Sequence, residues 1–209
     1  MKKHWFLLRL LTLSLFMASC GNHNGTPTTQ PISVSSESDC TEAVTEVSTE
    51  SEVTVAPTSD LAALSDYDLF ETVYLQMLDL VHSYPSESAA MEAMTQAQRV
   101  FYVLSMYDME MQNGGLCQFF TNASSTLVAD VEHCLEILGA DAHRDLFVDF
   151  METNQIDSSV LESFVIYDVD DYIEHTERYD FDSFDMAYYD LPPLFGDLAE
   201  YVRRHIDEF

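Results

Sequence analysis

The sequence predicts a single all-α domain, and three observations predict it. Apolar residues recur at three- and four-residue steps through most of the chain after residue 60, which is typical of helices that bury one face. Residues that favour helix N-caps stand in front of two of these stripes, at Ser65 and Thr95. No convincing alternation of β-branched and polar residues, the pattern of a half-buried strand, is visible. We therefore expect one compact multi-helix domain over residues 61–209.

The first two helices have the clearest start signals. Ser65 is the predicted N-cap of the first, and its apolar stripe runs from Phe70 to Val81 and ends before Pro85. A polar connector is expected next. Thr95-Gln96-Ala97-Gln98 then fits a capping box and opens the second helix. The residues of that helix that we expect to face inward are Val100, Leu104, Tyr107 and Met111.

The remaining elements follow from the same periodicity, with less distinct boundaries. We expect a third helix from about Ser125 to Gly139, a fourth from about Asp141 and a shorter fifth from about Ser158 to Tyr167. Residues 168–182 are interpreted as an acidic loop. A short turn of helix at residues 184–189 and a last helix at residues 194–206 complete the domain.

Residues 1–20 are predicted to be an export signal. Lys2 and Lys3 supply the positive start, and an apolar run from residue 5 to residue 17 is short for a membrane span of about 20 residues. The segment Met17-Ala18-Ser19-Cys20 resembles the end of a bacterial lipoprotein signal, in which the cysteine, here Cys20, is lipidated. If Cys20 is an ordinary cysteine, the segment is still a secretory signal. We therefore expect an extracytoplasmic protein, attached to the bacterial cell membrane through its lipid anchor only.

Residues 21–60 are predicted to be a disordered tether. Ser, Thr, Glu, Pro and Val dominate this segment, and it contains no aromatic residue. Such a composition buries too little apolar area to offset the entropy of ordering the backbone. The tether would hold the domain away from the membrane surface.

The charge balance restricts the class of partner. The chain has 37 Asp and Glu against 8 Lys and Arg, a net charge of −29. Three of the basic residues, Lys2, Lys3 and Arg9, lie within the predicted signal, so only five arginines face all 37 acids in the remainder, a charge of −32. Such a field repels nucleic acid and attracts cations and basic proteins. Direct nucleic-acid binding is therefore not expected, and solubility alone is the alternative explanation of the acidity.

The stretch from Glu110 to Asn122, which we call the glycine corner, organises the domain. Helical sequence leads into Asn113-Gly114-Gly115, which fits a chain that leaves a helix through a positive φ. The aromatic pair Phe119-Phe120 is expected to be buried beside that helix. The stretch contains no group that can act as a positioned base, so we interpret it as a packing corner and predict no catalytic residue.

The glycine corner also carries a resemblance. Glu110, Asn113-Gly114-Gly115, Gln118-Phe119-Phe120 and Asn122 resemble the signature of a bacterial domain family, largely of unknown function, that is named after a small acidic DNA-mimic protein. Similar spacing covers roughly residues 62–209. The resemblance implies an all-α domain, and DNA mimicry for those members that share the relevant surface. Homodimers are compatible with it.

The most acidic segment, residues 168–190, is the candidate binding surface. Its acids face one basic residue, Arg178, and are interleaved with aromatic residues. Duplex DNA carries roughly one charge per 1.7 Å of its axis, and closely spaced carboxylates can approach that density. A solvated acidic face is the alternative, and a calcium site is a third, although the 12-residue loop pattern with its glycine is missing. The candidate partner-binding acids are Asp168, Asp170, Asp171, Glu174, Glu177, Asp180, Asp182 and Asp185.

Histidine and cysteine chemistry has little support in the sequence. His175, beside Glu174 and Glu177, is the best candidate for acid–base or metal work, and an exposed titrating side chain is the simpler interpretation. Cys117 and Cys134 are either a disulfide or two buried thiols on neighbouring helices, of which the second is favoured because pairing requires close, correctly aimed Cβ atoms. We predict no metal site and no cofactor.

Three functional hypotheses follow. The leading one is non-enzymatic binding of a basic protein or peptide through the acidic surface. The second is an enzyme or small-ligand module with a pocket near the glycine corner, where Gln118, Asn122 and a histidine would converge. The third is an envelope domain whose acidity only keeps it soluble.

Overall fold

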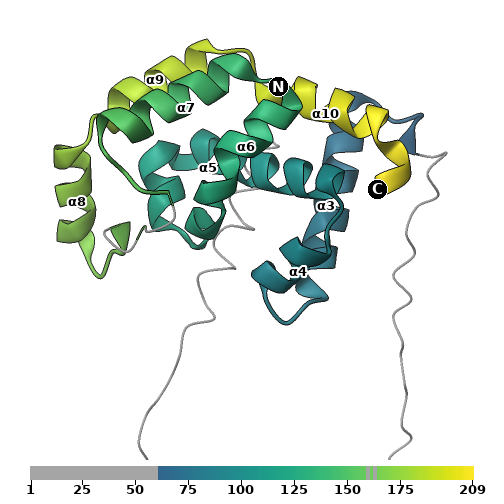
Figure 1. The fold of residues 1–209 in the computed structure, drawn as a ribbon, viewed down its shortest axis with the longest axis horizontal. Coiled ribbons are helices and arrows are strands. Elements are labelled where there is room, and N and C mark those ends of the chain that lie inside the picture. The colour runs from purple at the N-terminus through teal and green to yellow at the C-terminus, as the bar shows by residue number, and fades with distance from the viewer. Residues whose placement is uncertain (1–60, 159–160, 162–163) are drawn as a thin grey trace, which may run out of the picture.

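The computed structural model describes residues 61–158, 161 and 164–209 of the chain (Figure 1). The predicted signal, residues 1–20, and the predicted tether, residues 21–60, lie outside the described residues. Within the described part, none of the helices combines the length and the apolar character that a membrane crossing requires.

The described residues form eight α-helices and no strand, which confirms the predicted all-α class. Short 3₁₀ turns, η1 at Ala123–Leu127 and η3 at Ile206–Glu208, accompany them. The helices are α3 (Asp66–His82), α4 (Glu87–Ala93), α5 (Gln96–Thr121), α6 (Val128–Leu138), α7 (Asp141–Thr153), α8 (Val169–Arg178), α9 (Phe181–Asp190) and α10 (Leu194–Arg204).

Helix α5 is the centre of the fold. It packs against α3, α6, α9, α10 and η1. Its sequence is apolar around most of its circumference, and Phe101, Tyr102, Tyr107, Met111 and Phe119 are all fully buried, as a helix surrounded by others requires. Figure 1 shows α7, α8 and α9 at one end of the domain and α3, α4 and α10 at the other.

The predicted helix starts and stops are confirmed where a side chain or a glycine defines them. The Ser65 hydroxyl accepts a hydrogen bond from the Asp68 backbone N–H at 3.3 Å and begins α3. Thr95 and Gln98 form the complete capping box of α5, with distances of 3.2 and 3.1 Å. Gly139 ends α6 with a positive φ of 83°.

Helices α4 and α9 differ from the elements that the sequence predicted. Helix α4 lies where a polar connector was predicted; Ser86 caps it, and Ala90 and Met91 are its buried side. Its seven residues show too little apolar periodicity to identify it in sequence. Helix α9, in turn, is longer than the short turn predicted at residues 184–189.

Helix α8 corrects the predicted acidic loop at residues 168–182. Asp168 caps its N-terminus by accepting hydrogen bonds from the backbone N–H groups of Asp170 and Asp171, at 2.9 and 3.2 Å. Acids in a first turn also interact favourably with the helix dipole, so the charges that suggested a loop promote this helix. The fifth helix predicted over residues 158–167 is not found, because the described residues of that stretch are not α-helical.

An aromatic cluster joins α8 and its preceding segment to the core. Phe120 of α5 lies 5.0 Å, ring centroid to ring centroid, from Phe164 and 6.1 Å from Phe181 of α9. Phe164 in turn lies 5.0 Å from His175 and 5.3 Å from Tyr179. These contacts hold one side of α8 against the domain and leave its other side exposed to solvent.

Candidate partner-binding surface

The two glycines break α5 without ending it. Gly114 has φ −156° and ψ 15°, and Gly115 has φ 77° and ψ −170°, after which the chain returns to helix as far as Thr121. The predicted positive φ is confirmed at Gly115, and Phe119 and Phe120 are buried as expected. The chain thus leaves the regular helix at these glycines, as expected, and a second helical stretch follows directly and ends at Thr121.

Asp185 of α9 serves as a distant cap for the second part of α5. Its Oδ1 accepts a hydrogen bond from the Leu116 N–H at 3.0 Å, a donor that the break leaves without an intrahelical partner. A Cβ at Gly115 would lie 1.8 Å from Asp185 Oδ2, so only glycine fits there. Burial raises the pKa of Asp185, and the backbone hydrogen bond acts against this shift. Asp185 is thus half-buried and engaged in the fold.

Glu110 is the centre of a buried hydrogen-bond network in the glycine corner. Its carboxylate accepts hydrogen bonds from Gln118 Nε2 at 2.6 Å, Asn122 Nδ2 at 3.0 Å and Ser124 Oγ at 2.8 Å, and the residue is 5% exposed. Gly114 leaves room for this arrangement, since a Cβ there would lie 2.2 Å from Gln118 Oε1. The spacing of the motif residues is therefore explained by a satisfied buried carboxylate and the close packing around it.

A second polar contact fixes α9 on α5. The Tyr188 hydroxyl donates a hydrogen bond to Asp108 Oδ1 at 2.6 Å, and the Tyr189 hydroxyl donates to the Met111 carbonyl. Burial raises the pKa of Asp108, and the hydrogen bond from Tyr188 offsets part of that effect. Asp108 could not be identified from sequence, because a lone Asp within an apolar helix carries no pattern that shows its partner.

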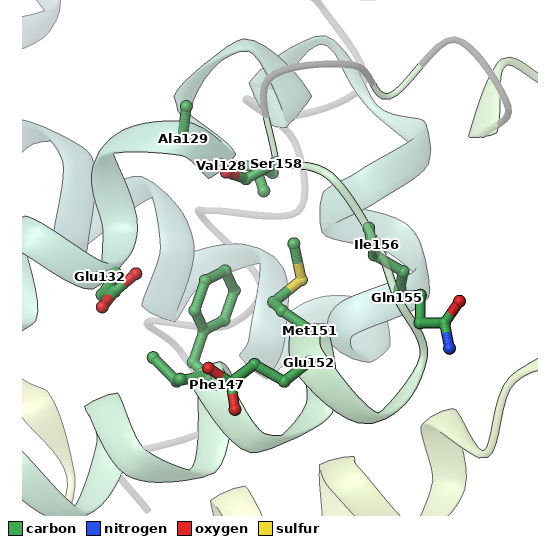
Figure 2. A pocket seen from close by; sticks show the side chains of 10 residues that line it. Val128, Ala129, Glu132, Phe147, Met151, Glu152, Gln155, Ile156 and Ser158 are labelled. Atoms are coloured by element: carbon green, nitrogen blue, oxygen red, sulfur yellow. The ribbon is translucent and has the colours of Figure 1, made fainter.

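The polar groups required by the enzymatic hypothesis do not converge on a free site. The amides of Gln118 and Asn122 donate to Glu110, as described above. A cavity of about 270 Å³ lies elsewhere, between α6, α7 and the residues after α7 (Figure 2). It contains neither of those amides and no histidine. Its lining residues are Val128, Ala129, Glu132, Phe147, Val148, Met151, Glu152, Gln155, Ile156 and Ser158.

The eight candidate acids divide into two groups. Four take part in hydrogen bonds that shape the backbone. Asp168 caps α8, Asp171 accepts from the Tyr167 N–H at 2.8 Å, and Asp180 caps α9 by accepting from the Ser183 N–H at 3.1 Å. Asp185 caps the second part of α5. These carboxylates contribute to the field of the surface, but the fold itself uses them.

The other four acids, Asp170, Glu174, Glu177 and Asp182, are exposed, and none of them forms a hydrogen bond or ion pair with another described residue through its carboxylate. Asp170, Glu174 and Glu177 are separated by four and three residues, so they lie on one face of α8. That face is opposite the side that packs through His175 and Tyr179. We call Asp170, Glu174 and Glu177 the carboxylate stripe.

Arginines neutralise acids elsewhere in the domain. Arg178 is the only arginine near the stripe in sequence, and its guanidinium lies over the Tyr179 ring, 5.2 Å from the centroid. Within the described ranges, no acid between residues 168 and 190 lies at ion-pair distance from an arginine or histidine. The ion pairs of arginine are Arg99–Asp130, Arg144 with Asp141 and Asp145, and Arg203–Asp66.

The histidine and cysteine positions are structural. His175 is buried on the inner side of α8, so the expectation of an exposed titrating side chain is wrong. Cys117 and Cys134 are both buried and free, and burial raises their pKa values to about 11 and about 12. The part of the chain that the structure describes contains no group of three or more His, Cys, Asp or Glu side chains that could hold a metal ion.

Fold and surface together define the class: an all-α, strongly acidic domain with a helix that presents carboxylates without a neutralising partner. The chain belongs to the DMP19-like protein family, where DMP19 stands for DNA mimic protein 19, and the family model matches residues 92–205. The match spans the glycine corner and α8, and it confirms the resemblance drawn from the corner. The family is not a known enzyme family. No curated protein and no solved structure is significantly similar to the chain.

Proposed function

We propose that the protein is a non-enzymatic binding domain that holds a basic protein or peptide through the carboxylate stripe, with Asp182 at the start of α9 as a further exposed acid. The observation that carries the proposal is the unpaired state of these acids. Residues 61–209 contain 30 Asp and Glu against five Arg, a net charge of −25. Three of those arginines form ion pairs with acids outside residues 168–190. Membership of a DNA-mimic family supports the same class of partner.

Repulsion within the stripe costs the free protein stability, although Asp170, in the first turn of α8, also interacts favourably with the helix dipole. Like charges at three- and four-residue spacing on a helix are destabilising by about 0.2–0.5 kcal/mol per pair. Glu177, in the last turn of α8, also faces the negative end of the helix dipole. A basic partner would relieve both effects on binding. Solubility alone does not require that the acids share one helix face.

The charges of the stripe are spaced more widely than those of DNA. A helix rises 1.5 Å per residue, so neighbouring members of the stripe are about 5 Å apart along α8. Phosphates of one DNA strand follow each other at about 3.4 Å along the axis. The stripe is therefore sparser than DNA, and a partner that grips it through charge alone needs the summed field of the domain as well.

We also propose that the protein acts outside the cytoplasm as a lipoprotein, on the basis of the signal at residues 1–20 and of Cys20. A DNA-binding protein is the partner that the family suggests. In an exported protein the corresponding partner is an extracytoplasmic basic protein or peptide. The location is tested by growing cells with a labelled fatty acid and separating their membrane and soluble fractions. The proposal is supported if the wild-type protein carries the label and the variant Cys20→Ser does not. A wild-type protein that is soluble and unlabelled contradicts the proposal.

Binding is tested by affinity capture with the full chain at low salt and again at about 0.5 M salt, where charges on the surface are screened. The proposal expects a basic protein to be recovered at low salt and released at high salt. The variant Asp170→Asn/Glu174→Gln/Glu177→Gln should lose it. The matched control Asp79→Asn/Glu92→Gln/Glu200→Gln removes the same three charges from exposed positions on α3, α4 and α10. Equal capture by both variants would leave the acidity with a role in solubility only.

A further inference from the structure

Exposed apolar side chains lie on α8 and in the segment that leads into it. Ten large apolar residues in the described part of the chain are exposed, and five of them lie within nine residues of sequence. Tyr167 is 88% exposed, Val169 72% and Ile173 45%. Single exposed apolar residues are ordinary on a protein surface, whereas contiguous ones mark interaction sites. We call this set the apolar patch: Val165, Ile166, Tyr167, Val169 and Ile173.

The apolar patch and the stripe share helix α8. Val169 and Ile173 are four residues apart, so they follow each other along one flank of the helix. Ile173 is also three residues from Asp170 and four from Glu177, which makes both acids its neighbours on the helix surface. One side of α8 thus faces the core, one carries carboxylates, and the flank next to the carboxylates is apolar and exposed.

From this juxtaposition we infer that the partner is a cationic amphipathic helix, which places basic side chains on the stripe and apolar ones on the patch. The inference rests on the proposed function and states what kind of basic partner the same surface takes. Charge complementarity requires a positively charged partner, because the field of the domain repels nucleic acid and anionic lipid headgroups. The apolar patch requires an apolar face on the partner, because a purely charged partner would leave the side chains of the patch without apolar contacts.

The spacing of the acids matches a helical partner. The carboxylates recur at four and three residues, about one per helical turn over about 10 Å. Basic residues on one face of a nearly aligned helix recur with the same period. On an extended chain, residues of one face repeat every 6.6–6.8 Å or so, and they would lose register with the stripe. Two turns of a partner helix are therefore enough to meet all three acids.

A second copy of this chain does not have the properties of the inferred partner. The acids of one α8 would face those of another, and the arginines outside it are few, three of them being held in ion pairs. Arg178 belongs to α8 itself. The occupant is thus a different molecule with a positive charge.

The test measures peptide affinity in about 0.1 M salt with the full chain carrying Cys20→Ser, which cannot be lipidated. One probe is an 18-residue Leu/Lys peptide patterned as an amphipathic helix, and the other has Ser in place of every Leu and the same charge. We expect the amphipathic probe to bind about tenfold more tightly or better, since burial of one or two half-exposed apolar side chains corresponds to such a factor.

The variant Ile173→Ser should reduce the affinity for the amphipathic probe several-fold and leave that for the Ser-containing probe unchanged. Leu75→Ser is the matched control, because Leu75 is 50% exposed in the middle of α3, away from the patch, and should change neither affinity. Circular dichroism confirms that both variants are folded.

Failure of the inferred amphipathic partner can be distinguished from failure of the proposed function. Equal affinity for the two probes, with no effect of Ile173→Ser, would overturn the amphipathic partner and leave charge-based binding intact. If neither probe binds even in about 20 mM salt, the proposed function itself is contradicted, and this inference with it.

Discussion

The glycine corner and helix α8 use carboxylates in opposite ways. In the corner, Glu110 accepts three side-chain hydrogen bonds, and the half-buried Asp185 of α9 accepts one from the Leu116 N–H, so the fold uses both acids. On α8, Glu174 and Glu177 are exposed and have no such partner. An acidic composition alone therefore identifies no binding residue. The surroundings of each carboxylate decide whether its loss weakens the fold or the proposed binding.

The largest effect is expected at Gly115. Gly115→Ala places a Cβ in a residue with φ 77° and against the Asp185 carboxylate, which must move away from the Leu116 N–H. We expect a loss of unfolding free energy of about 3–5 kcal/mol, measured by urea denaturation. Gly139→Ala is the control, because Gly139 has φ 83° but open space around it, and it should lose only about 1 kcal/mol. Similar losses in both variants would contradict the role of Asp185.

Removal of the Glu110 carboxylate should have the next largest effect. Glu110→Ala leaves the partly buried amides of Gln118 and Asn122 and the buried hydroxyl of Ser124 without their acceptor, and we expect a loss of about 3 kcal/mol. Glu177→Ala, on the exposed face of α8, should change the unfolding free energy by no more than about 0.5 kcal/mol. Thermal denaturation of the two variants compares the two regions directly, and equal stability would remove the distinction between them.

The pH dependence of stability should include a contribution from Asp108. Its pKa is raised in the folded state by burial. As the pH rises above about 4, the unfolded chain ionises this group first, so the folded state loses stability until it ionises too. Asp108→Asn removes this contribution, and its stability should fall less between pH 4 and pH 7 than that of the wild type. Asp79→Asn, which removes an exposed charge, should follow the wild-type slope. Parallel curves for wild type and Asp108→Asn would show that burial does not affect this carboxyl.

A small gain is expected outside both regions, at Gln155. This residue has φ 54°, the only positive φ among the described non-glycine residues, and it follows the C-cap of α7. Gln155→Gly should raise the unfolding free energy by about 0.5–1 kcal/mol, since glycine adopts this conformation without a Cβ penalty. A loss of stability in a calorimetric scan would show that the Gln155 side chain contributes more than its backbone conformation costs.

The apolar periodicity of the sequence was sufficient to predict the helices that have a capping residue and a continuous apolar face. Ser65, Thr95 and Gly139 each define a boundary locally, and the structure follows them. It failed at α8, because acids near a helix N-terminus and acids in a loop look alike in sequence. The partners of Glu110 lie 8 to 14 residues away and those of Asp185 about 70, so no local pattern shows which acids the fold encloses.

The candidate site was only partly predictable from the sequence, because it also depends on contacts between distant residues. The acids of residues 168–190 are identified by composition alone, whereas their division depends on long-range contacts and on helix faces. His175 illustrates the limit: its acidic neighbours in sequence suggest exposure, but its position on α8 turns it toward Phe164. The apolar patch became visible only when α8 placed Val169 and Ile173 beside the acids.

The most direct test combines stability and binding for Asp170→Asn/Glu174→Gln/Glu177→Gln in one preparation. The substitutions remove the repulsion within the stripe and also the favourable interaction of Asp170 with the helix dipole, which are of similar size, so the variant should keep the stability of the wild type to within about 1 kcal/mol. It should also lose its affinity for a cationic amphipathic peptide by tenfold or more. A variant that loses clearly more than about 1 kcal/mol of unfolding free energy, or one that binds the peptide as well as the wild type does, would contradict the account.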